Sequence, residues 1–347
     1  MSELKIVVIG AGFAGRVIHV PGYRAAFAPV AALCDAEEPR AQALARENSI
    51  PRVYTDWRSM LAEEKPDVVS VCLPNVCHRE VTIAALDAGA HVLCEKPLAT
   101  SVADARAMFD AARRNGKRLM AAQHFRFEPA AQAIKRAVES GDLGQVYYAE
   151  ATALRRLGIP TWGTFHQRAS SFGGCLLDIG VHMLDQTVWL MGNPTAARVS
   201  AVTQQRFGRR PEIAAAMRNA WDPQRFDVED FGVAFVRFED GASLVLRTSW
   251  AAHIGESRFS SRLLGTEGGA ITDPPTLYRL RDGAQVDEEF KALPKVSGWG
   301  LEMAHWLAVV RGEAEPLVRE EETMNVQRIL NAAYRSAEEG REVEVDQ

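Results

Sequence analysis

Residues 5–15 have the sequence KIVVIGAGFAG, a short apolar strand that continues directly into a turn with three glycines. In such a turn Gly10 allows the tight bend, Gly12 lets the backbone approach a pyrophosphate, and Gly15 allows the next helix to pack closely on the strand. Glycine-rich turns are common in loops, but here the turn stands between a strand and a helix, as dinucleotide binding requires. The motif therefore predicts a cofactor domain at the start of the chain.

Short β-rich runs alternate with helical stretches through the first third of the chain. The runs are Lys5–Ile9, Val30–Cys34, Val68–Leu73, His91–Cys94 and Arg118–Ala122. Apolar strands that alternate with helices predict a parallel, doubly wound sheet covered on both faces, with its ligand site beyond the carboxyl ends of the strands. Ser101 and Asp104 form a capping-box-like pair at the start of one helix. Pro21 predicts a break of the first helix into two short helices near residue 20.

The kind of dinucleotide is indicated by Asp35, which ends the second run 20 residues after Gly15. A carboxylate at this position accepts hydrogen bonds from the ribose hydroxyls and repels a 2′-phosphate, which favours NAD over NADP. The alternative role for Asp35 is the N-cap of the helix expected at 36–46, and the two roles are compatible. Arg40, one turn further on, softens the discrimination and leaves NADP possible.

The length and composition suit a globular protein of two domains, which we expect at 1–125 and 126–347. The chain is 47% hydrophobic and 24% charged, and its net charge of −5 argues against nucleic acid or an anionic membrane as the main partner. No apolar run approaches the roughly 20 residues that cross a bilayer. Because the chain starts on a strand pattern without a charged leader, a cytoplasmic location is expected.

After about residue 125 the pattern changes to a helix at Glu128–Glu139 and then to long alternating runs. The runs are Val146–Arg155, Ala197–Arg206, Val228–Phe238 and Ala242–His253. Asp240-Gly241, between the last two, is a strong hairpin signal. Long alternating strands joined by tight turns predict an antiparallel sheet with two different faces.

Two local patterns suit proton and hydride chemistry. Lys96, in Glu95-Lys96-Pro97, follows the run that ends at Cys94, where a lysine can donate to a substrate oxygen and stabilise an alkoxide. Asp178 and His182 are four residues apart in a predicted helix at about 176–190, so they share one face, and an imidazole held by a carboxylate suits proton transfer. On spacing alone, a solvated loop lysine and a surface Asp–His pair are the more common explanations.

A metal site is not expected. The five cysteines (Cys34, Cys72, Cys77, Cys94 and Cys175) lack metal-type spacing and fit reduced cysteines of an apolar core. Zinc favours close-set Cys and His, whereas the region around His182 offers one of each with two carboxylates, Asp178 and Asp185.

Four segments, in this order, resemble the glucose–fructose oxidoreductase / inositol dehydrogenase / MocA (Gfo/Idh/MocA) family. They are the glycine loop at 10–15, Pro74-Asn75-x-x-His78, AGAHVLCEKPLA at 88–99 and GGCLLDIGVHMLD at 173–185. The resemblance covers essentially the whole chain, and the Glu-Lys-Pro and Asp-x-x-x-His segments are specific as a pair. The family often has a third glycine where this chain has Cys175.

The resemblance implies an NAD(P)-dependent oxidoreductase that moves a hydride between nicotinamide and a secondary alcohol of a sugar or inositol-like polyol. It implies a second domain with a large, mostly antiparallel sheet flanked by helices, with the substrate on one face and a homodimer or homotetramer interface on the other. The alternatives are an NADPH-dependent sugar ketoreductase and a non-enzymatic, dinucleotide-sensing regulator of the same fold.

The resemblance also assigns candidate roles to residues. Lys96, Asp178 and His182 match the catalytic positions. The loop at 155–166, rich in arginine and aromatic residues, suggests substrate contacts. As substrate-side residues we select Trp162 in this loop and Arg126 outside it. The expected cofactor-binding residues are Gly10, Gly12, Phe13, Ala14, Gly15, Asp35, Leu73, Asn75, His78, Glu95 and Lys96.

Overall fold

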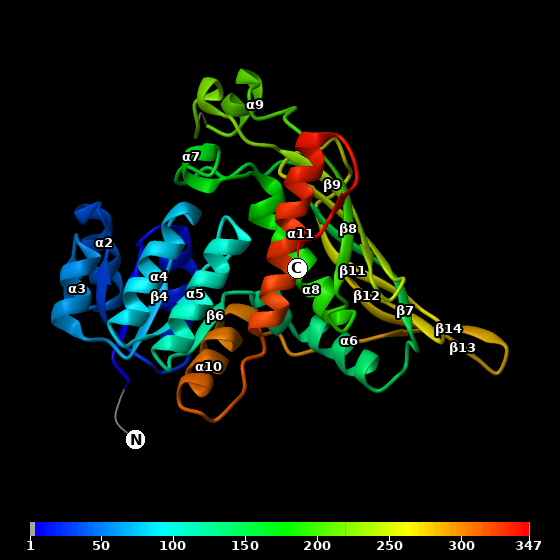
Figure 1. Cartoon of the computed structure of the whole chain (residues 1–347), viewed down its shortest axis with the longest axis horizontal. Coiled ribbons are helices and arrows are strands. Elements are labelled where there is room, and N and C mark those ends of the chain that lie inside the picture. Colours follow the sequence, from blue (N-terminus) through cyan, green and yellow to red (C-terminus); the bar gives the residue numbers. More distant parts are fainter. Residues whose placement is uncertain (1–3, 219, 347) are drawn as a thin grey trace. The chain divides into compact units, whose positions relative to one another are not determined.

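The structure is a computed structural model that describes residues 4–218 and 220–346. The chain forms two compact units. Figure 1 shows the whole chain, coloured along the sequence. The first contains the chain up to His124 together with Ser297–Glu320, and the second contains Phe125–Val296 and the chain from Glu321 onward. Among the described residues, no helix is long and apolar enough to cross a membrane.

The first unit is built on a six-stranded parallel sheet. Its strands are β1 (Ile6–Ile9), β2 (Val30–Cys34), β3 (Arg52–Tyr54), β4 (Val68–Val71), β5 (His91–Cys94) and β6 (Leu119–Ala121). They lie in the order β3-β2-β1-β4-β5-β6, the order of a Rossmann fold, whose switch point for ligands lies between β1 and β4. The five predicted runs are confirmed, and β3, three residues long, is the additional strand.

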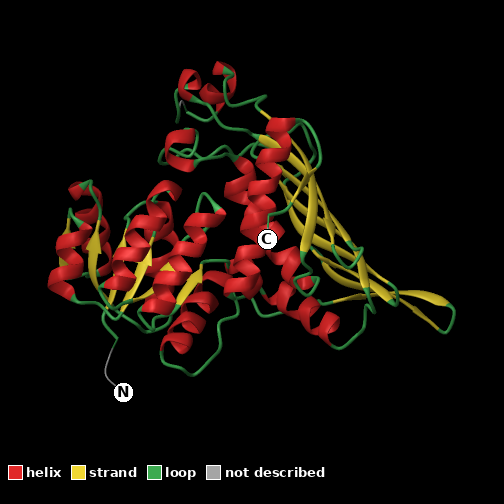
Figure 2. Ribbon diagram, in the orientation of Figure 1, coloured by secondary structure: helices red, strands yellow, loops and turns green. Residues whose placement is uncertain are grey.

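Helices flank the strands of this sheet (Figure 2). They are η1 (Ala14–His19), α1 (Val20–Ala25), α2 (Glu38–Asn48), α3 (Trp57–Glu64), η2 (Asn75–Cys77), α4 (His78–Asp87), α5 (Val102–Arg114) and α10 (Gly298–Val310), with η3 (His124–Phe127) at the passage to the second unit. Ser101 caps α5 by accepting a hydrogen bond from the amide of Asp104 at 3.1 Å. The sheet and its helices confirm the doubly wound fold.

The sequence predicted that the first helix breaks near Pro21. In the structure the helix continues past this residue, and only its hydrogen-bond spacing changes. Residues 14–19 form a π-helical segment in which the amide of Val20 donates to Gly15, and an α-helix continues without a gap from Val20. The proline, which has no amide hydrogen, lies in the first turn of that α-helix, where a missing donor is tolerated.

A second difference concerns α10, which the division at residue 125 assigns to the second domain. The structure packs this helix in the first unit: a Cβ on Gly22 would lie only 2.6 Å from Met303, and the rings of His124 and Trp299 lie 5.4 Å apart. The close approach at a glycine explains why α1 and α10 can pack together. The first unit is therefore discontinuous in sequence.

The second unit is built on a nine-stranded sheet, in the order β14-β13-β12-β11-β7-β10-β9-β8-β15. Its pairs are antiparallel except β7 and β10, which run parallel at the centre. The strands are β7 (Val146–Leu154), β8 (Ala196–Gln204), β9 (Phe231–Phe238), β10 (Ser243–Ser249), β11 (Arg258–Gly265), β12 (Gly268–Thr272), β13 (Pro275–Arg281), β14 (Ala284–Glu289) and β15 (Val343–Glu344). The four predicted runs correspond to β7 to β10, and the mostly antiparallel sheet is confirmed.

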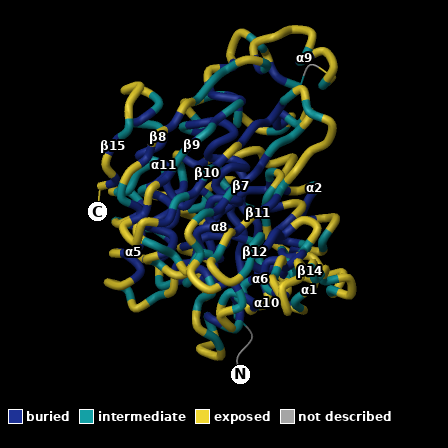
Figure 3. Tube along the Cα trace, turned by 90° about the vertical axis from the view of Figure 1, so that its right-hand side faces the viewer, coloured by how far each residue is buried: buried dark blue, intermediate teal, exposed yellow. Residues whose placement is uncertain are grey.

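One face of this sheet is covered within the unit, so burial alternates along a strand such as β9, whose Gly232, Ala234, Val236 and Phe238 are buried (Figure 3). The helices of the unit are α6 (Pro129–Glu139), α7 (Arg168–Ser171), η4 (Leu176–Gly180), α8 (Val181–Leu190), α9 (Pro211–Ala216), η5 (Pro223–Arg225) and α11 (Glu320–Glu339). The segment η4–α8 is the helix that the sequence placed at 176–190.

Candidate active site

The three glycines of the first turn have different surroundings. Gly10 has φ +107°, and a Cβ there would lie 2.1 Å from the carbonyl oxygen of Cys72; a Cβ on Gly15 would lie 1.9 Å from the carbonyl oxygen of Gly10. These two positions exclude a side chain because of the protein's own backbone. A Cβ on Gly12 would meet no atom within 4 Å. Gly12 thus keeps an open approach to the backbone at the position where a pyrophosphate binds, so the loop fits a dinucleotide.

Asp35 directly follows β2, beside this loop, and each of its two carboxylate oxygens accepts two hydrogen bonds. Oδ2 accepts from the amide of Ala11 at 2.8 Å and from Nε of Arg40 at 3.1 Å. Oδ1 accepts from the amide of Glu37 at 2.9 Å and from Nη2 of Arg40 at 2.7 Å. Burial by itself raises the pKa of Asp35, but these donors outweigh it and lower the pKa. Arg40 therefore donates to both oxygens of the carboxylate that the sequence assigns to a ribose.

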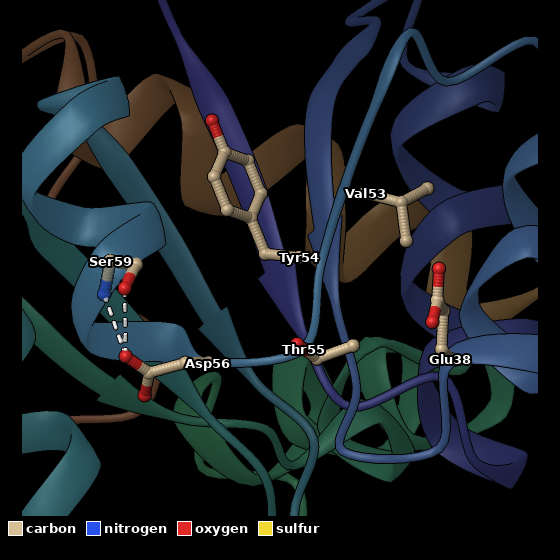
Figure 4. A pocket seen from close by; sticks show the side chains of 6 residues that line it. All are labelled: Glu38, Val53, Tyr54, Thr55, Asp56 and Ser59. Carbon is tan, nitrogen blue, oxygen red and sulfur yellow. Dashed lines mark hydrogen bonds between the residues drawn. The ribbon is translucent and has the colours of Figure 1, made fainter.

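An open hollow lies beyond the end of β3 (Figure 4). It is lined by Glu38, Val53, Tyr54, Thr55, Asp56 and Ser59. Asp56 is already in use there, because its carboxylate accepts from the amide and the hydroxyl of Ser59 and so caps α3. Since β3 is the edge strand, with β2, β1 and β4 between it and β5, this hollow is remote from the turn that carries Lys96.

Lys96 follows β5 at the carboxyl edge of the sheet and is half-buried. Its neighbour Glu95 is buried, accepts a hydrogen bond from the Lys96 amide at 3.1 Å and contacts Nε2 of His19 at 3.0 Å. Burial alone raises the pKa of Glu95, but the His19 hydrogen bond and the nearby charge of Lys96 lower it to about 2. Burial lowers the pKa of His124, close by, to about 3. An anionic carboxylate and a neutral imidazole therefore accompany Lys96.

His78 does not contribute to the cofactor site in the way that the sequence predicted. Its side chain is fully buried, with Nδ1 2.9 Å from the carbonyl oxygen of Pro97 and Nε2 2.9 Å from that of Leu73. Burial disfavours the charged ring, but Cys94 and the two carbonyl groups outweigh it and raise the pKa to about 9. Both ring nitrogens donate to the backbone, so His78 connects the Leu73 and Pro97 loops instead of offering a nitrogen to a ligand.

The remaining expected cofactor residues lie along the same edge of the first unit. Ala14 is the first residue of η1, Phe13 precedes it with 40% of its surface exposed, and Asn75 is the buried first residue of η2. Leu73 contributes its backbone carbonyl to His78. Their contacts with a cofactor stay predictions.

In the second unit, Asp178 lies in the π-helical turn η4 and His182 in the first turn of α8. Both side chains are less than 10% exposed. The indole Nε1 of the buried Trp250 donates to Oδ2 of Asp178 at 2.8 Å, and the ring of Phe125 lies 5.1 Å from that of His182. A π-helical turn at this place is notable, because such turns occur often at functional sites.

The start of this helix is held by a buried carboxylate. Glu229 accepts from the amides of Gly174 at 2.8 Å and Leu176 at 3.0 Å, and from the hydroxyl of Tyr334 at 2.7 Å. A Cβ on Gly174 would lie 1.8 Å from the carbonyl oxygen of Glu229. Cys175, where the family often has a third glycine, is fully buried and contacts the carbonyl oxygen of Thr248 through Sγ at 3.8 Å. The helix start therefore accommodates a cysteine.

Arg126 is not a substrate-side residue, contrary to our selection. It is completely buried, and its Nε and Nη2 donate to the two oxygens of Asp185 at 2.7 Å each. Nη1 donates to Glu322 on α11, and the guanidinium lies 5.6 Å from the ring of Trp189. Through these contacts, Arg126 connects α8 and α11. Trp162 lies half-buried in the loop at 155–167, where a substrate role stays a prediction.

Three residues of the site region were missed in the sequence: His19, Glu229 and Trp250. None belongs to a motif, and each reaches its partner across more than 50 residues of chain. Within the described residues, no group of three or more His, Cys, Asp or Glu side chains is arranged to hold a metal ion.

Comparison with known proteins assigns the chain to a family. Residues 4–123 match the model of the oxidoreductase family with an NAD-binding Rossmann fold (GFO_IDH_MocA), and residues 135–345 match its C-terminal alpha/beta domain. D-glucoside 3-dehydrogenase of Escherichia coli K12 is 36% identical over 346 residues, 99% of this chain and 98% of that protein. Levoglucosan dehydrogenase of Pseudarthrobacter phenanthrenivorans is 30% identical over 306 residues, 82% of this chain and 76% of that protein.

The fold has a close counterpart in a solved structure of levoglucosan dehydrogenase in complex with NADH and levoglucosan. The two structures superpose with a TM-score of 0.85, at 25% identity and over 100% of both chains. With the open glycine turn and Asp35, these matches support an NAD-binding enzyme that acts on CH–OH groups. The chain belongs to the Gfo/Idh/MocA family of NAD(P)-dependent oxidoreductases.

Proposed function

We propose that this enzyme oxidises a ring hydroxyl of a pyranose, most favourably a D-glucoside, with NAD as the acceptor. Two relatives that match most of the chain act on glucose-derived rings, to judge from their names, a D-glucoside and levoglucosan. The open approach at Gly12 and the carboxylate of Asp35 favour NAD. The proposal covers sugars in preference to inositol, because the names of both relatives are those of sugar dehydrogenases.

The proposed mechanism divides proton and hydride transfer among three residues. NAD⁺, held at the glycine turn and Asp35, would supply the acceptor for the hydride of the carbinol carbon. His182 takes the proton of the hydroxyl as the C–H bond breaks, so that the alcohol becomes a ketone, and Lys96 stabilises the developing alkoxide charge. Asp178 orients His182 or a neighbouring sugar hydroxyl. Asn75, Glu95 and the backbone near Leu73 would hold the nicotinamide half of the cofactor.

The observation that carries this proposal is the environment of Asp178. A carboxylate that is almost buried normally has a specific partner, because its desolvation is costly. Here the indole of Trp250, which directly follows β10, donates to Asp178 at 2.8 Å. The nearly buried His182 lies four residues after Asp178. A surface Asp–His pair, the common alternative, has no need of a buried indole donor.

A second candidate, an NADPH-dependent ketoreductase, is favoured by one observation. Arg40 is bound to Asp35 through Nε and Nη2, and its side chain is 43% exposed, so it can turn toward a 2′-phosphate. No observation favours the regulatory alternative. Titration of both cofactors, followed by fluorescence, distinguishes the two enzymatic candidates.

We also infer a cytoplasmic homodimer or homotetramer. In register across four strands, Phe235, Val245, Glu150 and Arg262 lie on the sheet face that the unit itself leaves uncovered. Val202, beside Val233 on the same face, is 52% exposed. An apolar face with interspersed charges suits a second copy of the chain. Light scattering of the wild type and of Val202→Asp tests this.

The enzymatic proposal is tested with a panel of methyl D-glucopyranosides, free sugars and inositols, by following NADH absorbance. Lys96→Met and His182→Asn should each lower kcat by about 100-fold or more, whereas Lys117→Met should not. NAD binding should persist in all three variants. Near wild-type turnover in both site variants would contradict the assignment of Lys96 and His182.

A further inference from the structure

A chain of buried hydrogen bonds extends from Lys96 into the core of the first unit. The amide of Lys96 donates to Oε2 of Glu95 at 3.1 Å, and Oε1 of Glu95 lies 3.0 Å from Nε2 of His19. Nδ1 of His19 lies 3.0 Å from the hydroxyl of Ser70, which lies 2.8 Å from the hydroxyl of Tyr23. Three parts of the fold meet here: the first helix, strand β4 and the turn after β5.

The chain is shielded from solvent. His19, Ser70 and Tyr23 have no exposed surface, and Glu95 is 8% exposed. In such an environment an unpaired polar group is destabilising, so each member depends on its neighbour. Replacement of one member therefore acts first on its direct hydrogen-bond partner.

The directions of the hydrogen bonds follow from the chemistry of Glu95. Its pKa is lowered to about 2, so it is an anion that only accepts hydrogen bonds, and Nε2 of His19 must be the donor. The two oxygens of Glu95 thus have two different donors, an imidazole on one side and the Lys96 amide on the other. If His19 is lost, the carboxylate keeps only the Lys96 side and is free to turn.

We propose that His19 is a positioning residue for Lys96: by holding Glu95, it fixes the orientation of the peptide from which the lysine extends. The inference rests on the proposed catalytic role of Lys96. A catalytic group held slightly out of place loses much of its effect, because its contribution depends on geometry. His19 itself touches neither the substrate nor the cofactor in this proposal.

The same hydrogen-bond chain provides an internal comparison. Tyr23 is as deeply buried as His19 and also has a hydrogen bond to Ser70, but its connection to Glu95 runs through Ser70 and His19. Tyr23→Phe removes a buried hydrogen bond at the far end while it keeps the ring. A purely structural role for His19 predicts that its loss and the loss of the Tyr23 hydroxyl have similar consequences.

The kinetic test compares His19→Met, His19→Gln, Tyr23→Phe and Lys96→Met, with methyl D-glucopyranoside and NAD as probes. His19→Met should lower kcat about 10- to 100-fold, the effect of one hydrogen bond to a charged group, with little change in the Kd for NAD. His19→Gln should recover most of kcat, because its amide donates to Glu95. Tyr23→Phe should lower Tm by a few degrees and leave kcat within about twofold.

A second measurement does not depend on turnover. In the ¹⁵N NMR spectrum of the NAD-bound enzyme, the Lys96 amide signal should move in His19→Met and Glu95→Gln but not in Tyr23→Phe. An unmoved Lys96 amide signal in His19→Met would overturn the inference. This test holds even if none of the glucosides is a substrate. If Lys96→Met loses turnover while His19→Met behaves like Tyr23→Phe, only the inference fails. If Lys96→Met keeps turnover, the proposed mechanism and the inference fail together.

Discussion

Each unit has a π-helical turn next to glycines, but the glycines are needed for different reasons. The first turn, η1, begins at Ala14 within the Gly10–Gly15 loop, and the second, η4, begins at Leu176 shortly after Gly173-Gly174. In the first unit Gly12 has open space around its missing side chain. In the second unit both glycines face protein: a Cβ on Gly173 would lie 2.0 Å from the hydroxyl of Tyr334, and one on Gly174 would lie 1.8 Å from Glu229.

The difference shows how to distinguish a ligand-binding glycine from a packing glycine. Where the protein's own atoms exclude a side chain, as at Gly174, the glycine serves folding. At Gly12, which lies in the cofactor turn, nothing in the protein excludes a side chain, so folding does not explain the glycine and an approaching ligand does. The second unit uses its glycines to bring the helix of Asp178 against Glu229, and so determines where the proposed catalytic pair, Asp178 and His182, lies.

The largest effect is expected for Gly174→Ala. The added methyl group would collide with backbone atoms of Glu229 and disrupt the hydrogen bonds of its carboxylate to η4, at a cost of about 3 kcal/mol or more. Urea unfolding measures the loss. Gly300→Ala is the control, because that glycine lies in α10 and a Cβ there meets no atom within 4 Å. Equal stabilities of the two variants would contradict the packing role.

Gly12→Ala should have the opposite profile, with unchanged stability but weaker cofactor binding. No protein atom lies within 4 Å of the added group, so the urea midpoint should match the wild type. The methyl group would lie where the pyrophosphate approaches, and the Kd for NAD should rise about 10- to 100-fold by calorimetry. A loss of stability with unchanged affinity would assign Gly12 to packing.

The stability of the first unit should fall at alkaline pH because of His78. Its pKa of about 9 in the folded state lies above the unfolded value of 6.5, so the stabilisation is complete below pH 6.5 and is lost as the pH rises through 9. Between pH 6.5 and 9.5 the wild type should lose on the order of 2 kcal/mol more than His78→Gln. Parallel pH dependences in urea unfolding would show that His78 is neutral.

The smallest effect concerns Arg40. Its removal frees the carboxylate of Asp35 for the ribose hydroxyls and leaves its charge uncompensated against a 2′-phosphate. In Arg40→Ala the ratio of the Kd for NADP to the Kd for NAD should rise about tenfold, a change of roughly 1.4 kcal/mol. Arg46→Ala, on the same helix, is the control. A fall in this ratio would mean that Arg40 acts against NADP.

Much of the fold could be predicted because buried strands are continuous apolar runs. β1, β4 and β5 have this pattern, and the predicted bounds agree closely with the observed ones. β3 escaped prediction because it has three residues with little burial, and β14 because most of its residues are exposed on both faces. Packing of α10 in the first unit could not be predicted, since helical periodicity does not say which sheet a helix covers.

The sequence by itself determined the cofactor turn, the acidic end of β2 and the helix that carries Asp178 and His182, because these depend on residues adjacent in the chain. Only the tertiary structure decided which side chains support them. Trp250 reaches Asp178 from 72 residues away and His19 reaches Glu95 from 76. The tertiary structure also showed that Arg126 and His78, predicted to contact ligands, make internal hydrogen bonds. Burial and hydrogen-bond partners depend on how distant segments of the chain pack, and local sequence spacing does not encode that packing.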